Sequence, residues 1–255
     1  MNQSPAETIR PSLAEMGLLE HLRELRSRLF YAVLAVLVGA IVAYSWSSQL
    51  FFFLSKPYFD AFPDAPLIGT GPAEAFVLKL KVAIFAGALL ALPVLFYQIW
   101  AFVAPGLYPT EKRLVLPFVI ASTLCFLVGV WFCYTLVFPM AFSFFSEQYA
   151  SVGLSPTIRM SENLVTVLQG LLAFGLIFET PVLTFLFARC GLITDRTLIA
   201  GWRYIIVIIF VISAVLTPPD VLTQFLMAVP LLGLFALSIL IARYSGRNST
   251  PEGEN

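Results

Sequence analysis

The chain is organised as a series of long apolar stretches separated by short polar or proline-rich segments. A helix needs roughly 20 apolar residues to cross the ~30 Å hydrocarbon layer of a membrane, where every backbone polar group must find a partner inside the protein. Four stretches have about this length or more. Each predicts a membrane-spanning helix: Leu29 to Ser47, Phe76 to Phe102, Leu114 to Phe138 and Leu164 to Ala188.

Two further apolar stretches follow, Tyr204 to Leu216 and Val221 to Ala242. At about 1.5 Å per residue the first covers only about 20 Å, so either the two form a re-entrant hairpin or the bilayer is thinned around them. The pattern predicts an all-α polytopic membrane protein with six transmembrane helices, the fifth and sixth being short. We assign residues 18–242 to this membrane domain, 1–17 to a polar N-terminal extension and 243–255 to a short cytoplasmic tail.

The basic residues predict the orientation of these helices. If the N-terminus is cytoplasmic, eleven Lys and Arg residues lie on the cytoplasmic side and four on the other. Basic residues accumulate in cytoplasmic loops, so both termini are expected inside. The connections from Gln49 to Pro72 and from Met140 to Ser161 are longer and rich in aromatic, Pro and Gly residues, which indicates a cap of loops on the outer face.

The composition supports a membrane location and limits the kinds of ligand and reaction to be expected. Hydrophobic residues make up 59% of the 255 positions and charged residues only 12%, about half the share of a soluble chain. Acidic and basic residues are equal in number, so the chain has no net positive charge that would attract nucleic acid. The single histidine, His21, and three cysteines without C-x-x-C spacing offer no metal site. Nucleotide-binding and hydrolase motifs are absent, so we expect no cofactor and no enzymatic activity.

Carboxylates near the predicted cytoplasmic surface are the first candidate site. Leucines at helical spacing from Leu18 to Leu29 predict an amphipathic helix lying at the interface before the first span, and this helix carries Glu24. Either Glu24 pairs with Arg28 one turn later, or Glu20 or Glu24 is presented to a cationic partner. Glu111, in the first cytoplasmic loop, either begins the third span or joins such a site.

Glu179 is the most unusual charged residue, because it lies about 15 Å from the cytoplasmic end of the fourth span. An ionised carboxylate at this depth costs at least ~2.5 kcal/mol, so it should face a cavity or a partner, or be neutral between helices. Pro181 is expected to disturb the helix beside it. Gln169, ten residues earlier, is a candidate for the same polar track.

Five sequence blocks, in order along the chain, resemble the signature blocks of the TatC family, the receptor subunit of the twin-arginine translocase. The blocks begin at His21, Pro93, Tyr108, Phe174 and Leu216, and read HLRELRSRL, PVLFYQIWAFVAPGL, YPTEKR, FGLIFETP and LTPPD. Together they extend over most of the chain, from about residue 18 to 242.

The resemblance implies binding of twin-arginine signal peptides and export of folded proteins by the proton motive force, together with TatA-like and TatB-like single-span subunits. It implies that the chain belongs to a larger complex, with further copies of itself, in an energy-transducing membrane such as the bacterial cytoplasmic membrane. By position it assigns signal recognition to Glu24, Arg26, Phe102 and Glu111. It also assigns Pro57 and Asp220 to the outer face, Glu179 to the membrane interior, and Thr217 and Gln224 to partner contacts.

Residue chemistry agrees with this assignment, because a carboxylate accepts two parallel hydrogen bonds from a guanidinium and lysine cannot reproduce them. A proton-coupled carrier using Glu179 is the main alternative, but no internal repeat supports it. For the short fifth span we hypothesise that Ala214, Thr217 and Gln224 mark a docking face for partner helices. The competing explanation is that Thr217 and Gln224 cap the Pro218-Pro219 turn.

Overall fold

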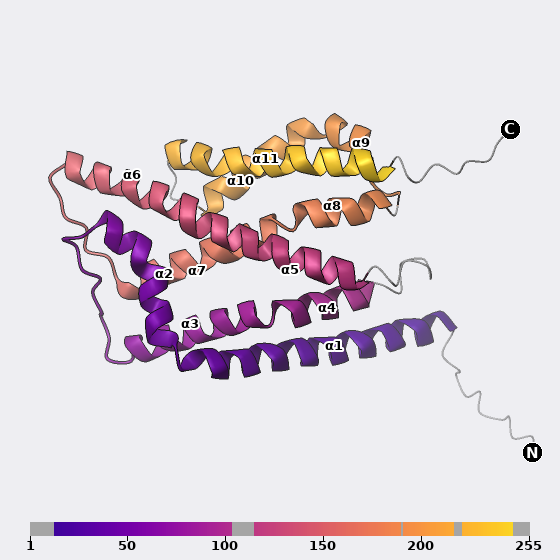
Figure 1. Cartoon of the computed structure of the whole chain (residues 1–255), viewed down its shortest axis with the longest axis horizontal. Helices are drawn as coiled ribbons and strands as arrows, with labels where there is room; N and C mark the ends of the chain where they lie inside the picture. Colours follow the sequence, from indigo (N-terminus) through magenta and orange to yellow (C-terminus); the bar gives the residue numbers. More distant parts are fainter. Residues whose placement is uncertain (1–12, 104–114, 190, 217–220, 247–255) are drawn as a thin grey trace, which may run out of the picture.

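A computed structural model describes residues 13–103, 115–189, 191–216 and 221–246, and almost all of these are helical (Figure 1). The helices follow the order α1 (Leu13–Tyr44), α2 (Ser47–Ala61), α3 (Glu74–Leu90), α4 (Leu92–Val103), α5 (Val115–Phe132), the π-helical turn η3 (Cys133–Val137), α6 (Phe138–Ser151), α7 (Met160–Ile177), α8 (Thr180–Arg189), α9 (Asp195–Ala200), α10 (Trp202–Leu216) and α11 (Val221–Gly246).

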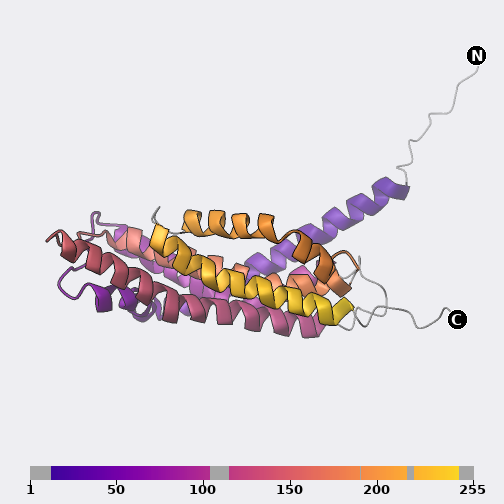
Figure 2. The same cartoon turned by 90° about the horizontal axis from the view of Figure 1, so that it is seen from above.

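Helix α1 runs without a break over 32 residues. The sequence predicted a separate interfacial helix before the first span, and this is wrong: the amphipathic segment continues the axis of the span and its N-terminal part projects from the bundle (Figure 2). Helix α1 packs closely on α3, because Gly39 and Gly87 let the two backbones meet. A Cβ added at Gly87 would lie 2.2 Å from the backbone nitrogen of Ala40.

The predicted second span is bent. Helices α3 and α4 meet at an angle of 58° across Ala91, and Pro93 in the first turn of α4 has no N–H to extend the hydrogen bonds of α3. By length and composition, three helical spans in the described part of the chain can cross a membrane, or four when this bent pair is one span.

The fourth span is interrupted as well. Helix α7 ends at Ile177, and α8 begins at Thr180, directly before Pro181. Glu179 lies in the gap, as expected from a proline that disturbs the helix there. Helix α7 has a continuous buried face that includes Leu164, Leu171 and Phe174, so this span forms the centre of the bundle.

Helices α10 and α11 correspond to the fifth and sixth apolar stretches. Helix α10 has 15 residues, which confirms the short fifth helix. Helix α11 has 26 residues, so the sixth is not short by helical length, although its described apolar part, Met227–Arg243, is shorter than a usual span. The start of α1 and the ends of α4, α8 and α11 lie at one end of the bundle (Figure 1), which we take as the cytoplasmic end.

The opposite end carries the expected cap, but much of it is helical. The connection predicted from Gln49 begins as α2, and α6 prolongs the third span to Ser151. The Ser146 hydroxyl donates to the Ala61 carbonyl (2.8 Å), which ties α6 to the end of α2. The segments that follow these helices meet in an isolated parallel β-bridge between Ile68 and Arg159.

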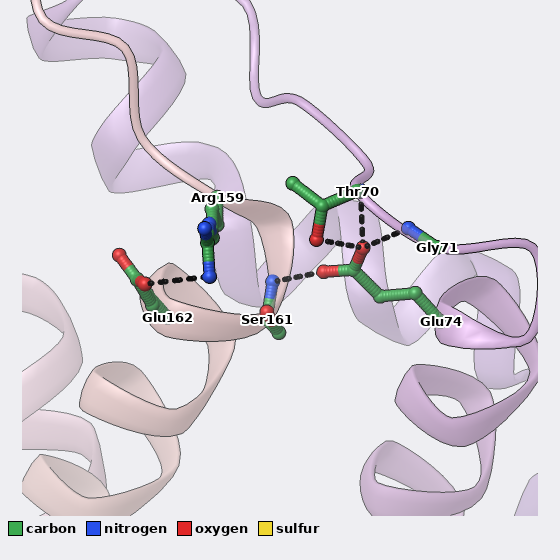
Figure 3. A network of polar contacts seen from close by, with 6 residues as sticks. All are labelled: Thr70, Gly71, Glu74, Arg159, Ser161 and Glu162. Carbon is green, nitrogen blue, oxygen red and sulfur yellow. Dashed lines mark hydrogen bonds and ion pairs between the residues drawn. The ribbon is translucent and has the colours of Figure 1, made fainter.

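The carboxylate of Glu74, at the start of α3, organises the cap (Figure 3). One oxygen accepts from the backbone N–H and hydroxyl of Thr70 and from the N–H of Gly71, and the other accepts from the N–H of Ser161 (3.2 Å). A carboxylate in the first turn also interacts favourably with the helix dipole. Glu74 therefore connects the start of α3 to the start of α7.

Candidate functional site

The cytoplasmic ends of α1 and α4 meet through an aromatic contact. The rings of His21 on α1 and Phe102 on α4 are stacked, with centroids 4.3 Å apart and an interplanar angle of 19°. The two residues are distant in sequence, and the α1–α3 packing together with the bend at Ala91 brings them together. This contact places Phe102, a predicted recognition residue, against His21, which lies one helical turn before Glu24 on α1.

Glu24 is half-buried and already holds one guanidinium. Its Oε1 atom accepts from Nε of Arg28 (2.9 Å) and also from Nη2, so the pairing expected from the i,i+4 spacing is present. The Oε2 atom lies 3.9 Å from Nδ1 of His21, beyond hydrogen-bond length. Among the described residues none donates a hydrogen bond to Oε2.

Arg26 does not join this group. Residues two apart face opposite sides of a helix, and the Arg26 side chain is exposed. Glu111 lies outside the described residues, so its position relative to Glu24 stays a prediction.

A second polar group lies inside the bundle around Glu179. This side chain is only 6% exposed, and its Oε1 atom has no hydrogen-bond partner among the described residues. Ser122 on α5 is a polar neighbour of this carboxylate, and the Ser122 hydroxyl accepts from Nε1 of Trp100 on α4 (3.0 Å). Glu179, Ser122 and Trp100 therefore form one polar group between α4, α5 and the α7–α8 break.

Gln169 does not extend this group. It lies on α7 with an exposed side chain, whereas Glu179 is buried at the α7–α8 break. The two residues therefore do not share one buried polar track.

The predicted docking residues fall on α10 and α11 or between them. Gln224 donates through Nε2 to the backbone carbonyl of Phe210 (2.9 Å), which fixes the start of α11 against α10. Ala214 is exposed on α10. Thr217 and Asp220 lie outside the described residues, so neither the docking hypothesis nor the turn-capping alternative is decided for them. Pro57 is buried inside α2, in a helix where the sequence predicted a loop.

Comparison with known proteins gives the family. The family model described as "Sec-independent protein translocase protein (TatC)" matches residues 20–230. This chain belongs to the TatC family. It is 42% identical to the TatC protein of Magnetococcus marinus over 228 residues, 89% of this chain and 83% of that protein. It is 43% identical to that of Campylobacter jejuni over 225 residues, 88% and 92% of the respective chains.

The structures agree with the sequences. A crystal structure described as the twin arginine translocase receptor TatC superposes with a TM-score of 0.78 at 36% identity, covering 88% of this chain and 99% of that one. The six-helix membrane fold of this TatC-family chain is therefore established, and the protein is an integral membrane protein with helices long enough to span the bilayer.

Sequence reasoning missed four residues of these groups in the TatC-family chain: His21 as a partner of Phe102, Ser122 and Trp100 beside Glu179, and Glu74 in the cap. A serine inside an apolar span and an acid two residues after a Thr-Gly-Pro turn are signals that point to Ser122 and Glu74. The His21–Phe102 and Trp100–Ser122 contacts join different helices, and one sequence carries no local signal for them.

Proposed function

We propose that this TatC-family chain is the signal-peptide receptor of a twin-arginine translocase, and that it exports folded proteins with TatA-like and TatB-like single-span partners, driven by the proton motive force. The observation that carries the proposal is the junction of α1 and α4 at the cytoplasmic end, where Glu24, His21 and Phe102 form one surface.

The Oε2 atom of Glu24, which has no hydrogen-bond donor among the described residues, supports recognition of an arginine pair. A carboxylate has about four acceptor sites on its two oxygens. Arg28 occupies Oε1 and holds the side chain in place, so an incoming guanidinium would bind Oε2 with little loss of side-chain freedom in Glu24. The ring of Phe102 beside it provides an apolar surface for the residues that flank the arginines. Glu111 would supply a second carboxylate from the following loop.

The exposed face of α10 supports docking of partner helices. Tyr204, Val207 and Val211 are each more than half exposed, and the helix is too short to span a bilayer by itself. Single-span partners would cover this apolar face by close packing, with Ala214 allowing near approach. Glu179 would supply the polar group at mid-membrane depth, and Pro57 and Asp220 would belong to the outer face.

Equilibrium binding tests the recognition site. The purified chain in lipid nanodiscs is titrated with a fluorescent peptide that carries an Arg-Arg signal motif, and the dissociation constant is measured for the wild type, Glu24→Gln and Glu111→Gln. Loss of a charge-assisted hydrogen bond weakens binding about tenfold or more, so we expect at least this loss in each variant.

The matched control is Glu147→Gln, which removes an exposed carboxylate from α6 at the predicted outer end. It should bind the peptide like the wild type. If Glu24→Gln and Glu111→Gln both bind with unchanged affinity while circular dichroism shows the native helix content, the peptide is recognised elsewhere.

A further inference from the structure

Two hollows meet on the lipid-facing side of α2, near the predicted outer boundary of the membrane. The first is a polar pocket of about 370 Å³ between α2 and the η3–α6 segment, and its wall includes Lys56, Asp60, Thr135 and Ser143. The second is an apolar groove of about 250 Å³ between α2, α3 and α5, lined by residues such as Ala86 and Leu127.

A stacked pair of aromatic rings forms the boundary between the two hollows. Phe53 on α2 and Tyr134 on η3 line both of them, with ring centroids 4.6 Å apart. The Tyr134 hydroxyl donates to the Phe53 carbonyl (2.7 Å), which holds the pair in place. The polar pocket and the apolar groove are therefore adjacent, with this pair of rings between them.

The depth of the pair matches the interface of the bilayer. Helix α5 begins at Val115, and at about 1.5 Å per residue Tyr134 lies ~30 Å from that end, the thickness of the hydrocarbon layer. Tyrosine rings favour this level. Leu127 lies two helical turns before Tyr134 on the same span, about 10 Å deeper. The groove therefore lies at the depth of the outer leaflet and the pocket at the level of its headgroups.

The pocket carries one positive and one negative side chain, which suits a zwitterionic headgroup. Lys56 and Asp60 lie one turn apart on α2 and are both exposed, and no ion pair joins either of them to another described residue. Lys56 is a donor suited to phosphate. Asp60 is an acceptor suited to an ammonium group.

The hydroxyl groups of the pocket add acceptors rather than donors. The Thr135 hydroxyl donates to the Trp131 carbonyl (2.8 Å), and the Tyr134 hydroxyl donates to Phe53. Their protons are committed, so their lone pairs remain for a ligand that carries N–H groups. A primary ammonium has three such groups, whereas a quaternary choline has none.

We propose that the pocket and the groove form one binding site for an outer-leaflet aminophospholipid of the phosphatidylethanolamine type. Its phosphate lies beside Lys56, its primary ammonium beside Asp60, and one acyl chain along the groove past Ala86 and Leu127. The bound lipid fills the space between α2 and the π-helical turn and holds the cap on the bundle.

Native mass spectrometry of the detergent-purified chain tests the site. Phosphatidylethanolamine, phosphatidylcholine and phosphatidylglycerol with identical acyl chains are titrated separately, and the dissociation constant of the first bound lipid is measured. We expect phosphatidylethanolamine to bind about two- to fivefold more tightly than the other two, the range for one partly exposed charge contact.

Two charge variants and one groove variant separate the parts of the site. Asp60→Asn should reduce the preference for ethanolamine over choline to near one, while the control Asp64→Asn, an exposed carboxylate elsewhere in the cap, keeps it. Lys56→Gln should weaken the binding of phosphatidylethanolamine and of phosphatidylcholine by a similar factor. Ala86→Phe fills the groove and should weaken all three lipids.

Thermal unfolding of each variant establishes that it is folded. Equal affinities for the three headgroups in the wild type, tighter binding of phosphatidylglycerol, or an ethanolamine preference that survives in folded Asp60→Asn would each overturn the proposal.

Discussion

Replacing Gly87 by alanine tests the contact on which the α1–α4 junction depends. The added Cβ would lie 2.2 Å from the Ala40 nitrogen and 2.6 Å from its Cα. Both are backbone atoms, so no side-chain rotation relieves the overlap and the two helices must separate. Because α4 continues from α3, a displaced α1 also moves His21 relative to Phe102.

The magnitude follows from overpacking. Extra methyl groups in a closely packed contact cost about 1–3 kcal/mol, and for a chain of this size about 1 kcal/mol lowers the unfolding midpoint by roughly 2–4 °C. We expect Gly87→Ala to lower the apparent midpoint by about 2–12 °C and to weaken binding of an Arg-Arg peptide.

The measurement is thermal unfolding in one detergent at one scan rate, followed by tryptophan fluorescence. Gly233→Ala is the matched control, because Gly233 lies within α11 and a Cβ there would meet no atom within 4 Å. Alanine favours the helix at such a position, so the control should unfold at the same or a higher temperature. If Gly87→Ala is as well tolerated as Gly233→Ala, the close packing of α1 on α3 is refuted.

Three further predictions concern topology, the membrane interior and partner docking. A reporter fused after Tyr244 should be active only in the cytoplasm, and activity on the outer side would reverse the orientation derived from the basic residues. Glu179→Gln, which keeps a hydrogen-bonding group beside Ser122, should retain at least several-fold more transport than Glu179→Leu in membrane vesicles. Full activity of both variants would show that the Glu179 side chain contributes only packing. Cysteines at Ala214 and Gln224 should form disulfides with a cysteine near the outer end of a partner helix, and preferential crosslinking from α1 would show that the docking face is misplaced.

The spans were predictable because apolar length is a local property of the chain. Each of the six predicted stretches forms helix over most of its described residues, and Pro181 correctly marked the disturbance in the fourth span. The bend at the α3–α4 junction was not predicted, although Pro93 has the same effect there as Pro181 has in the fourth span. Helix α2 was expected to be a loop because Pro57 and many aromatic residues fall in it, but this proline is tolerated within the helix.

The candidate site was predictable only in part. Glu24 and Arg28 have the spacing of a helical ion pair, and the structure has this pair. The stacking of His21 on Phe102 and the reach of Glu74 to Ser161 depend on how distant helices pack. Such contacts follow from tertiary structure, and no pattern of neighbouring residues encodes them.

Photocrosslinking to a signal peptide tests the proposed receptor function most directly. A photoreactive residue is placed beside the arginine pair of the peptide, and crosslinks to this chain in native membranes are mapped by mass spectrometry for an Arg-Arg peptide and its Lys-Lys counterpart. We predict crosslinks near Glu24 and Phe102 with Arg-Arg and several-fold fewer with Lys-Lys, because lysine lacks the planar pair of donors that a carboxylate accepts. Equal crosslinking of both peptides, or crosslinks confined to other parts of the chain, would contradict the account.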